Sequence, residues 1–221
     1  MAQHAAQPGP AAPSGGVVST QEAKRSVADE LRAIGELLAN RDLPLDLLAA
    51  AVAQLGATRT ALAAVPERRR WYETGDEGEH AAEISRAYHD EHGPVRGFAN
   101  PVAPPLVVQP VRRTAAGGPV EARARLGVLY EGPPSIVHGG WVAALFDEVL
   151  ALVQRDAGVG GVTARLTVRY RRPTPVGAEL ELRSWIDDDQ GRAVVAKATC
   201  HAEGELVAEA EAQFVRLPRR T

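Results

Sequence analysis

Residues able to act on a carbonyl group lie close together in the second half of the chain. His138-Gly139-Gly140 stands at the start of a predicted helix, and Asp147 lies further along it. Two glycines let a backbone approach a ligand closely. Free N–H groups in the first turn of a helix bind an anion or a developing oxyanion, and a carboxylate can act as a general base. A glycine turn with a capping histidine and an ordinary surface aspartate is the alternative interpretation.

The helix that carries these residues is predicted from about Gly140 to Asp156. Six apolar residues recur at helical spacing and form a stripe that should face the core: Val142, Leu145, Phe146, Val149, Leu152 and Val153. Asp147 lies on the opposite side, among alanines and Leu150. A carboxylate in such surroundings predicts that a ligand or another subunit approaches this face.

The distance along the helix bears on how Gly139 and Asp147 could work together. They are eight residues apart, which is about 12 Å at a rise of 1.5 Å per residue. One carbonyl group cannot reach both within a single chain. If both act, they come from two antiparallel helices related by a two-fold axis, so the catalytic interpretation predicts a homodimer with composite sites.

The strand predicted after this helix adds polar candidates. Between Val162 and Arg172, apolar residues alternate with polar ones, so we expect one set to face the core and the other to face away. The polar set includes Thr163, whose hydroxyl could hold a water molecule. It also includes Arg169 and Arg171, because guanidinium groups bind phosphates through paired hydrogen bonds. A solvent-facing strand with unrelated charges is the alternative.

The order of predicted elements defines the fold class. Only one helix interrupts a series of strands, which we expect at residues 106–113, 120–128, 162–172, 178–187, 193–202 and 206–217. Gly191 and Gly204 lie in two predicted hairpin turns. This order predicts an α+β fold, with a mainly antiparallel sheet curled around one long helix.

The chain before this domain is predicted in three parts. We expect a disordered tail at 1–18, a helical hairpin extension at 19–66 and a polar, irregular connector at 67–100, followed by the compact domain at 101–218. The hairpin is too short to hold a core alone, so it must pack on something else or on its own copy. His89 and His92 in the connector make a weak metal site, because no third ligand accompanies them.

Composition excludes several classes of protein. The 221 residues carry a net charge of −3, which gives no global signature of nucleic-acid binding. With 45% hydrophobic and 24% charged residues, the chain as a whole is not disordered. The single cysteine, Cys200, excludes an internal disulfide framework. Neither a secretory signal nor an apolar stretch of 18 residues is present, so we expect a cytoplasmic protein without a membrane segment.

Taken together, these motifs resemble the PaaI-like hot-dog thioesterases and the mammalian acyl-CoA thioesterases of the thioesterase-superfamily-member type. The resemblance covers about Val102 to Leu217. It is specific through its combination of a Gly-Gly turn, an acid nine residues after His138 and a threonine sixteen residues after the acid. The residues that carry it are Glu131 to Gly140, Asp147, Val162 to Ala164 and Tyr170 to Pro173.

The resemblance implies a hot-dog fold that pairs into dimers or tetramers and hydrolyses acyl-CoA thioesters without a metal ion or organic cofactor. Asp147 would be the general base or nucleophile, and Thr163 would orient water. The Gly139 N–H would polarise the thioester carbonyl, while His138 shapes the turn. Four residues would contact the substrate: Gly140, Arg169, Arg171 and Arg192.

One departure from the family pattern concerns the oxyanion site. Some relatives carry Asn or Gln six residues before the histidine, where this chain has Gly132. The backbone alone would then bind the oxyanion. Two other classes stay open: a non-catalytic hot-dog module that binds acyl-CoA or a partner, and a hot-dog dehydratase or hydratase.

Overall fold

The computed structural model describes residues 19–69, 71–73, 78–104, 106–109, 118–159 and 161–216. The tail predicted at 1–18 lies outside these residues, as does half of the strand predicted at 106–113. Within the described part of the first strand, only Val107–Val108 pairs into the sheet, as β1.

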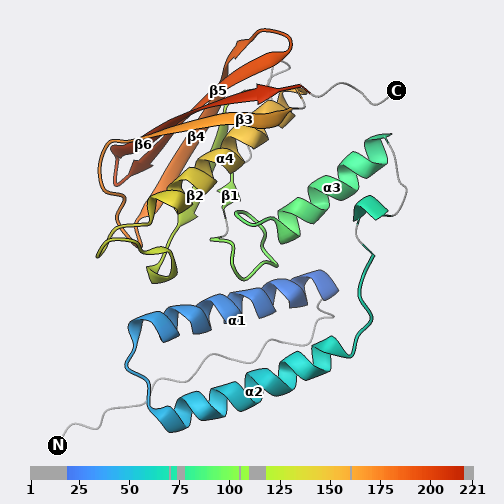
Figure 1. Ribbon diagram of the computed structural model, residues 1–221, viewed down its shortest axis with the longest axis vertical. Coiled ribbons are helices and arrows are strands. Elements are labelled where there is room, and N and C mark those ends of the chain that lie inside the picture. The colour runs from blue at the N-terminus through green and yellow to red at the C-terminus, as the bar shows by residue number, and fades with distance from the viewer. Residues whose placement is uncertain are drawn as a thin grey trace, which may run out of the picture.

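A six-stranded antiparallel sheet forms the C-terminal part of the chain (Figure 1). Its spatial order is β1-β2-β4-β5-β6-β3, so β3 lies at one edge. The remaining strands are β2 (Val120–Arg125), β3 (Val162–Tyr170), β4 (Glu179–Asp189), β5 (Ala193–Ala202) and β6 (Glu205–Val215). Gly191 and Gly204 lie in the two hairpin turns of this meander, and both have positive φ values that favour glycine.

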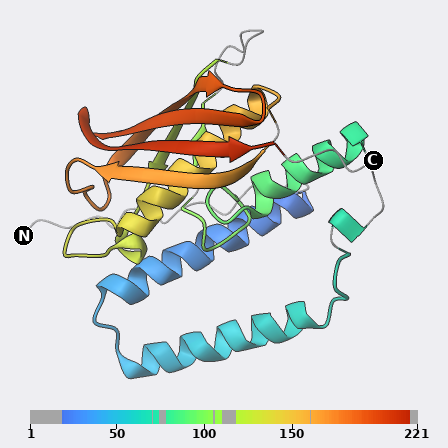
Figure 2. The ribbon, with the colours of Figure 1, turned by 45° about the horizontal axis from the view of Figure 1, so that its top comes forward.

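The sheet curves over one long helix, α4 (Gly139–Asp156), as Figure 2 shows. All six residues of the predicted apolar stripe are buried on the sheet side. Leu150, which the helical wheel placed beside Asp147 on the opposite face, is also fully buried. The predicted α+β architecture, a sheet wrapped around one helix with further helices before it, is confirmed and is the hot-dog fold.

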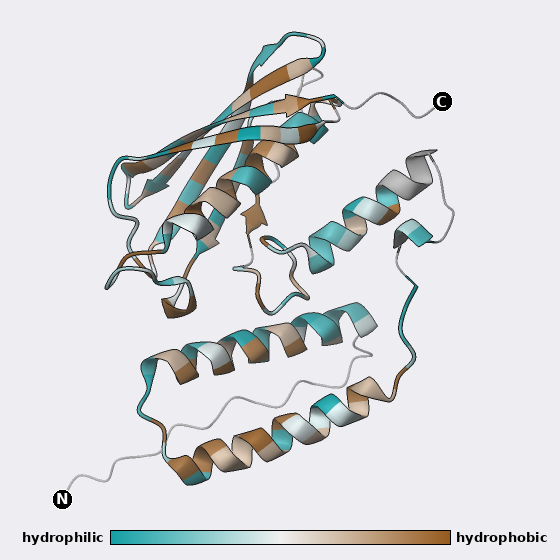
Figure 3. Cartoon of the chain, viewed as in Figure 1, coloured by the Kyte–Doolittle hydropathy of each residue, from teal (hydrophilic) through white to brown (hydrophobic). Residues whose placement is uncertain are grey.

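Two helices precede the domain, α1 (Thr20–Asn40) and α2 (Leu45–Ala63). A capping box starts α1: the Glu22 N–H donates to the Ser19 hydroxyl at 3.2 Å, and the Glu22 carboxylate accepts from the Ser19 N–H at 2.8 Å. In Figure 1, α1 lies beside the hot-dog domain and α2 lies beyond it. No residue of α2 is buried, and Figure 3 shows that apolar residues run along its length.

Two local predictions were wrong. The connector is not irregular throughout, since α3 spans Gly78–His92, after a short 3₁₀ turn at Trp71–Glu73. Its many charged residues obscured the helical spacing of Ile84, Tyr88 and Glu91. The strand predicted to reach Val128 ends at Arg125, and Val128–Tyr130 forms a second 3₁₀ turn, η2, which contacts α1.

Among the described residues, no helix is both long enough and apolar enough to cross a membrane.

Candidate functional site

A hollow of about 510 Å³ opens at the N-terminus of α4. His138, Gly139 and Gly140 line one side of it, and the segment Tyr170–Thr174, at and after the end of β3, lines the other. The walls therefore come from a helix start and a strand end that lie 30 residues apart in the chain. Four of the sequence-predicted residues meet here: His138, Gly139, Gly140 and Arg171. Asp147 and Thr163 do not line this hollow.

The helix start leaves one backbone donor available. The ring of His138 caps α4, because its Nδ1 accepts the Gly140 N–H at 3.0 Å. Gly140 is therefore not free to donate to a substrate. The Gly139 N–H, by contrast, has no hydrogen-bond partner among the described residues. This is the geometry that a glycine beside a capping residue provides for binding an oxyanion.

Tyr170 holds the Gly139 peptide in place. Its hydroxyl donates to the Gly139 carbonyl oxygen at 2.7 Å. A Cβ atom at position 139 would lie 3.2 Å from the Tyr170 hydroxyl oxygen and 3.3 Å from its ring carbon Cζ. A larger residue would therefore press on the ring and could be accommodated only if the Tyr170 side chain shifted.

Asp147 and Thr163 form a second cluster further along α4. The Thr163 hydroxyl donates to Asp147 Oδ1 at 3.1 Å, and both residues are exposed in the single chain. Thr163 thus keeps its oxygen lone pairs free to accept a hydrogen from water. The structure brings this predicted pair together, two helical turns from Gly139.

A β-bulge corrects the predicted alternation along β3. The sequence placed Thr163 on the same face as Arg169 and Arg171, but the register shifts between Thr163 and Arg165. Thr163 pairs with the buried Phe214 and faces α4, whereas Arg169 pairs with Glu209 on the outer face of the sheet. A bulge inserts one extra residue and reverses the side on which later residues lie.

The three predicted arginines do not form one site. Arg171 lines the hollow at α4 and donates to Glu209 Oε1 at 2.5 Å. Arg169 contacts the same carboxylate oxygen at 3.6 Å but lines a different hollow, of about 470 Å³, on the outer face of the sheet. Arg192 is exposed in the turn between β4 and β5 and lines neither. Sequence reasoning missed Arg172, which lines the hollow at α4 beside Arg171.

Gly132 departs from the family pattern for a steric reason. A Cβ atom there would lie 3.0 Å from His138 Cα and 3.2 Å from His138 Cβ, which is tighter than ordinary contact. The loop is closed by the Gly132 N–H, which donates to the Ile136 carbonyl oxygen at 2.8 Å. A side-chain amide could enter this position only if the loop or the His138 side chain moved.

Comparison with known proteins agrees with this architecture. Residues 135–209 match the model of the thioesterase superfamily. A crystal structure of a thioesterase superfamily protein superposes with a TM-score of 0.70 and 28% identity, over 87% of this chain and 94% of that one. The hot-dog domain alone is too short for that coverage, so the superposition extends into the segment before it.

Two curated relatives match the domain in sequence. Acyl-coenzyme A thioesterase THEM4 of Xenopus laevis is 33% identical over 93 residues, which cover 41% of this chain and 42% of that protein. The THEM4 of Mus musculus is 30% identical, over 41% of this chain and 40% of that protein. The chain therefore matches less than half the length of these relatives. Its C-terminal domain has the hot-dog fold and is similar, over residues 135–209, to the thioesterase superfamily.

Proposed function

We propose that this protein is an acyl-CoA thioesterase, which hydrolyses a thioester to a free acid and CoA. The observation that carries the proposal is the hydrogen bond between Thr163 and Asp147, at 3.1 Å. It sets an exposed carboxylate beside a hydroxyl that can hold water, on a domain similar to a superfamily named for this reaction. The unpaired Gly139 N–H supplies the donor that a developing oxyanion needs.

The proposed reaction requires only water as co-reactant. Asp147 accepts a proton from a water molecule held by the Thr163 hydroxyl, and the resulting hydroxide attacks the thioester carbonyl carbon. The carbonyl oxygen becomes negatively charged and accepts a hydrogen bond from the Gly139 N–H. The C–S bond then breaks, and CoA leaves as a thiolate; a thiol pKa of about 8.5 makes this departure easy without an acid. Direct attack by the Asp147 carboxylate is the alternative route.

The two clusters require a second copy of the chain to act on one carbonyl. The outer edge of β3 pairs with no strand among the described residues, although it is nine residues long. The β3 strands of two copies could pair in antiparallel fashion, centred on Leu166. Thr163 of one copy would then lie beside the C-terminal end of β3 in the other copy. That end carries the tyrosine that holds Gly139, so Asp147 would approach Gly139 of the partner subunit. We infer a homodimer with two composite sites, able to associate further into tetramers.

The N-terminal helices supply a further surface for the second copy. Leucine and valine side chains along α1 and α2 are 40–81% exposed, including Leu45 (81%) and Val52 (72%). A standard interface buries roughly 800 Å² per partner, and its centre is rich in apolar side chains. Since α2 carries only Asp46 and Arg59 as charged residues, its partner must be equally apolar. We infer that these helices brace the assembly.

Thiol release from acyl-CoA substrates tests the activity. Asp147→Asn should lower kcat at least 1,000-fold, because the base or nucleophile is lost. Thr163→Val should lower it about 10- to 100-fold, while Thr167→Val, on the other face of the same strand, should leave it unchanged. Full turnover by Asp147→Asn would contradict the mechanism. No release by the wild type from any acyl-CoA would instead favour a binding module.

A mixed assembly tests the composite site. Asp147→Asn and Gly139→Val chains, each inactive alone, should recover activity when co-expressed, because one site of each mixed dimer combines an intact Gly139 with an intact Asp147. We expect about half the wild-type activity per purified mixed dimer. If each chain holds a complete site, no activity returns.

A charged substitution on α2 tests whether this helix contributes to the interface between subunits. Val52→Asp should raise the dissociation constant of the assembly at least tenfold, as measured by light scattering over a dilution series. Gln54→Asp places the same charge at an exposed polar position of the same helix and should change it less than twofold. Equal dissociation constants for the two variants would exclude α2 from the interface.

A further inference from the structure

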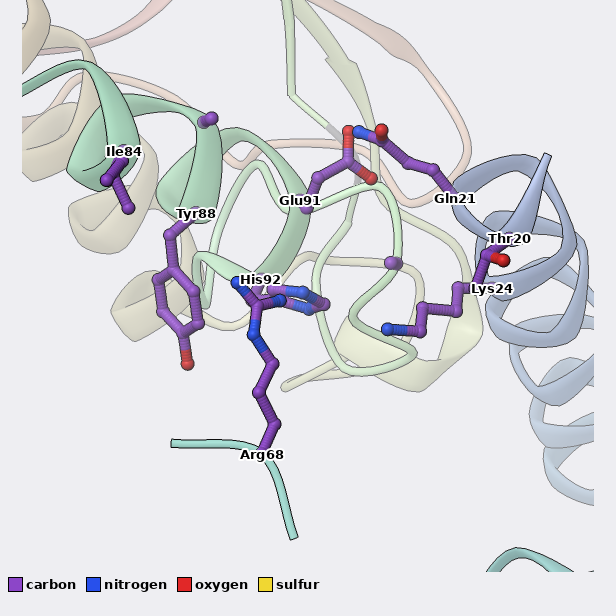
Figure 4. Close-up of a pocket in the computed structure, with 10 residues that line it drawn as sticks. Thr20, Gln21, Lys24, Arg68, Ile84, Tyr88, Glu91 and His92 are labelled. Atoms are coloured by element: carbon purple, nitrogen blue, oxygen red, sulfur yellow. The ribbon is translucent and has the colours of Figure 1, made fainter. Parts of the chain in front are cut away.

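A separate hollow of about 410 Å³ lies between α1, α3 and the segment that follows α2 (Figure 4). Its lining shares no residue with the hollow at the start of α4. Lys24 of α1, Arg68 of the connecting segment and His92 of α3 converge on it. In Figure 4, Lys24 points towards the ring of His92, and the Arg68 guanidinium group reaches the same ring.

The positive charges in this hollow lack compensation. Within the described residues, neither Lys24 nor Arg68 forms an ion pair. The pKa of His92 is lowered, first by burial and then by the charges of Lys24 and Arg68, with Glu91 acting in the opposite direction. Two separate elements thus bring the cations Lys24 and Arg68 together beside the His92 ring, and an anion bound between them would be stabilised by both charges.

Glu91 lies in the same hollow but does not neutralise these cations. Its carboxylate accepts from Arg25 Nε at 3.0 Å and from Arg25 Nη2, and the Gln21 side chain bonds to it as well. The guanidinium group of Arg25 holds the pKa of Glu91 below its usual value. The negative charge of Glu91 is therefore already paired with Arg25, and the Lys24–Arg68 end of the hollow stays positive.

The rest of the wall favours a flat ring over a bare ion. The ring centroids of Tyr88 and His92 are 5.0 Å apart, with the planes tilted by 51°. Ile84, Ala87 and Ala99 add apolar surface. A volume of about 410 Å³ lies in the range of roughly 300–1,000 Å³ that holds small organic ligands.

We propose that this hollow binds a nucleotide-type organic phosphate, with the phosphates on Lys24 and Arg68 and the base against Tyr88 and His92. Guanidinium and ammonium groups bind phosphate through charge-assisted hydrogen bonds. Two ligands share this chemistry: a free nucleotide and the nucleotide portion of a CoA thioester. Only the second of these rests on the proposed thioesterase function.

Calorimetric titration of the full chain with ADP tests the proposal. The wild type should bind ADP, and the Lys24→Gln/Arg68→Gln variant should bind at least tenfold more weakly. Both side chains are exposed, so the variant should keep its fold, as its thermal melt would show. Arg69→Gln removes the same charge at the adjacent position, outside the hollow, and should bind ADP as the wild type does.

Several outcomes would overturn the proposal. They are absence of ADP binding by the wild type, equal affinity in the double variant, and an equal loss in Arg69→Gln, which would indicate a diffuse charge effect. If inorganic phosphate bound as tightly as ADP, the Tyr88 and His92 rings would contribute nothing to affinity. The proposal that the ligand is a nucleotide would then be wrong.

The source of the phosphate is decided by kinetics in the same variants. A raised KM for acyl-CoA at unchanged kcat in the double variant would assign the nucleotide portion of the thioester to this hollow. An unchanged KM together with lost ADP binding would assign a free nucleotide. ADP titration does not depend on turnover, so Asp147→Asn should bind ADP normally even if the thioesterase proposal fails.

Discussion

The hot-dog domain and the N-terminal helices use apolar residues in opposite ways. In the domain, alternate residues of β4 and β5 are buried against α4, and Phe146 and Phe214 are almost fully enclosed. In α1 the predicted apolar stripe is largely exposed, with Val27 at 50% and Leu38 at 54%. Helical spacing of apolar residues therefore predicts a helix correctly. It does not show whether the apolar face is buried in the single chain.

Polar contacts attach α1 to the domain. The Glu36 carboxylate accepts the N–H of Val128 at 3.1 Å, and Arg32 donates to the carbonyl oxygen of Asn100 at 2.6 Å. Near the start of the helix, the guanidinium group of Arg25 lies 5.3 Å from the centroid of the Phe98 ring. This docking is directional, and it leaves the apolar side of α1 available for another surface.

The hot-dog domain and the N-terminal helices should differ most in the rate at which a cysteine thiol reacts. Burial raises the pKa of Cys200 to about 12, so little thiolate forms near neutral pH, and the thiol is enclosed in the sheet. A cysteine introduced by Thr58→Cys on the exposed α2 should react with a thiol dye at pH 8 at least 100-fold faster. Equal rates in the native protein would show that the domain opens as readily as the helices.

Truncation in the domain core should have the largest effect on stability. Phe146→Ala removes a fully buried ring and should lower the free energy of unfolding by about 3–5 kcal/mol. Urea denaturation followed by tryptophan fluorescence measures this. A loss below about 1 kcal/mol would mean that the core repacks, and that the contrast with the N-terminal helices is smaller than the burial indicates.

Loss of one polar contact should release α1 without unfolding the sheet. Glu36→Ala leaves the N–H of Val128 without its acceptor and should weaken the docking of α1 by about 1–3 kcal/mol. Hydrogen exchange should then speed up in α1 and stay slow in β4 and β5. Faster exchange in the strands as well would show that the two regions unfold as one unit.

The smallest effect is expected at the start of α1. Ser19→Ala removes the N-cap oxygen and should lower the local stability of the helix by about 1 kcal/mol. Amide exchange of residues 20–24 should quicken while the unfolding midpoint of the domain stays within error. Ser26→Ala, a position where the hydroxyl bonds only to the carbonyl oxygen of Glu22, is the matched control and should have less effect.

Much of the domain was predictable because its signals are local. The apolar stripe of α4, the alternation along the strands and the turn glycines each indicate one element, and the structure confirms them. α3 was missed because its many charged residues outweigh its few apolar ones. The face of Thr163 was predicted wrongly because the register shifts between Thr163 and Arg165, so Thr163 faces α4 while Arg169 stays on the outer face, as expected.

The sequence by itself determined the fold class and the residues that can act on a carbonyl group, because composition, spacing and helix length are properties of the chain alone. Only the tertiary structure decided which of these residues meet. It joined Thr163 to Asp147, paired Tyr170 with Gly139 and occupied the Gly140 amide with His138. It also brought Lys24, Arg68 and His92 together from three elements. Contacts of this kind depend on packing between distant segments, which no local pattern encodes.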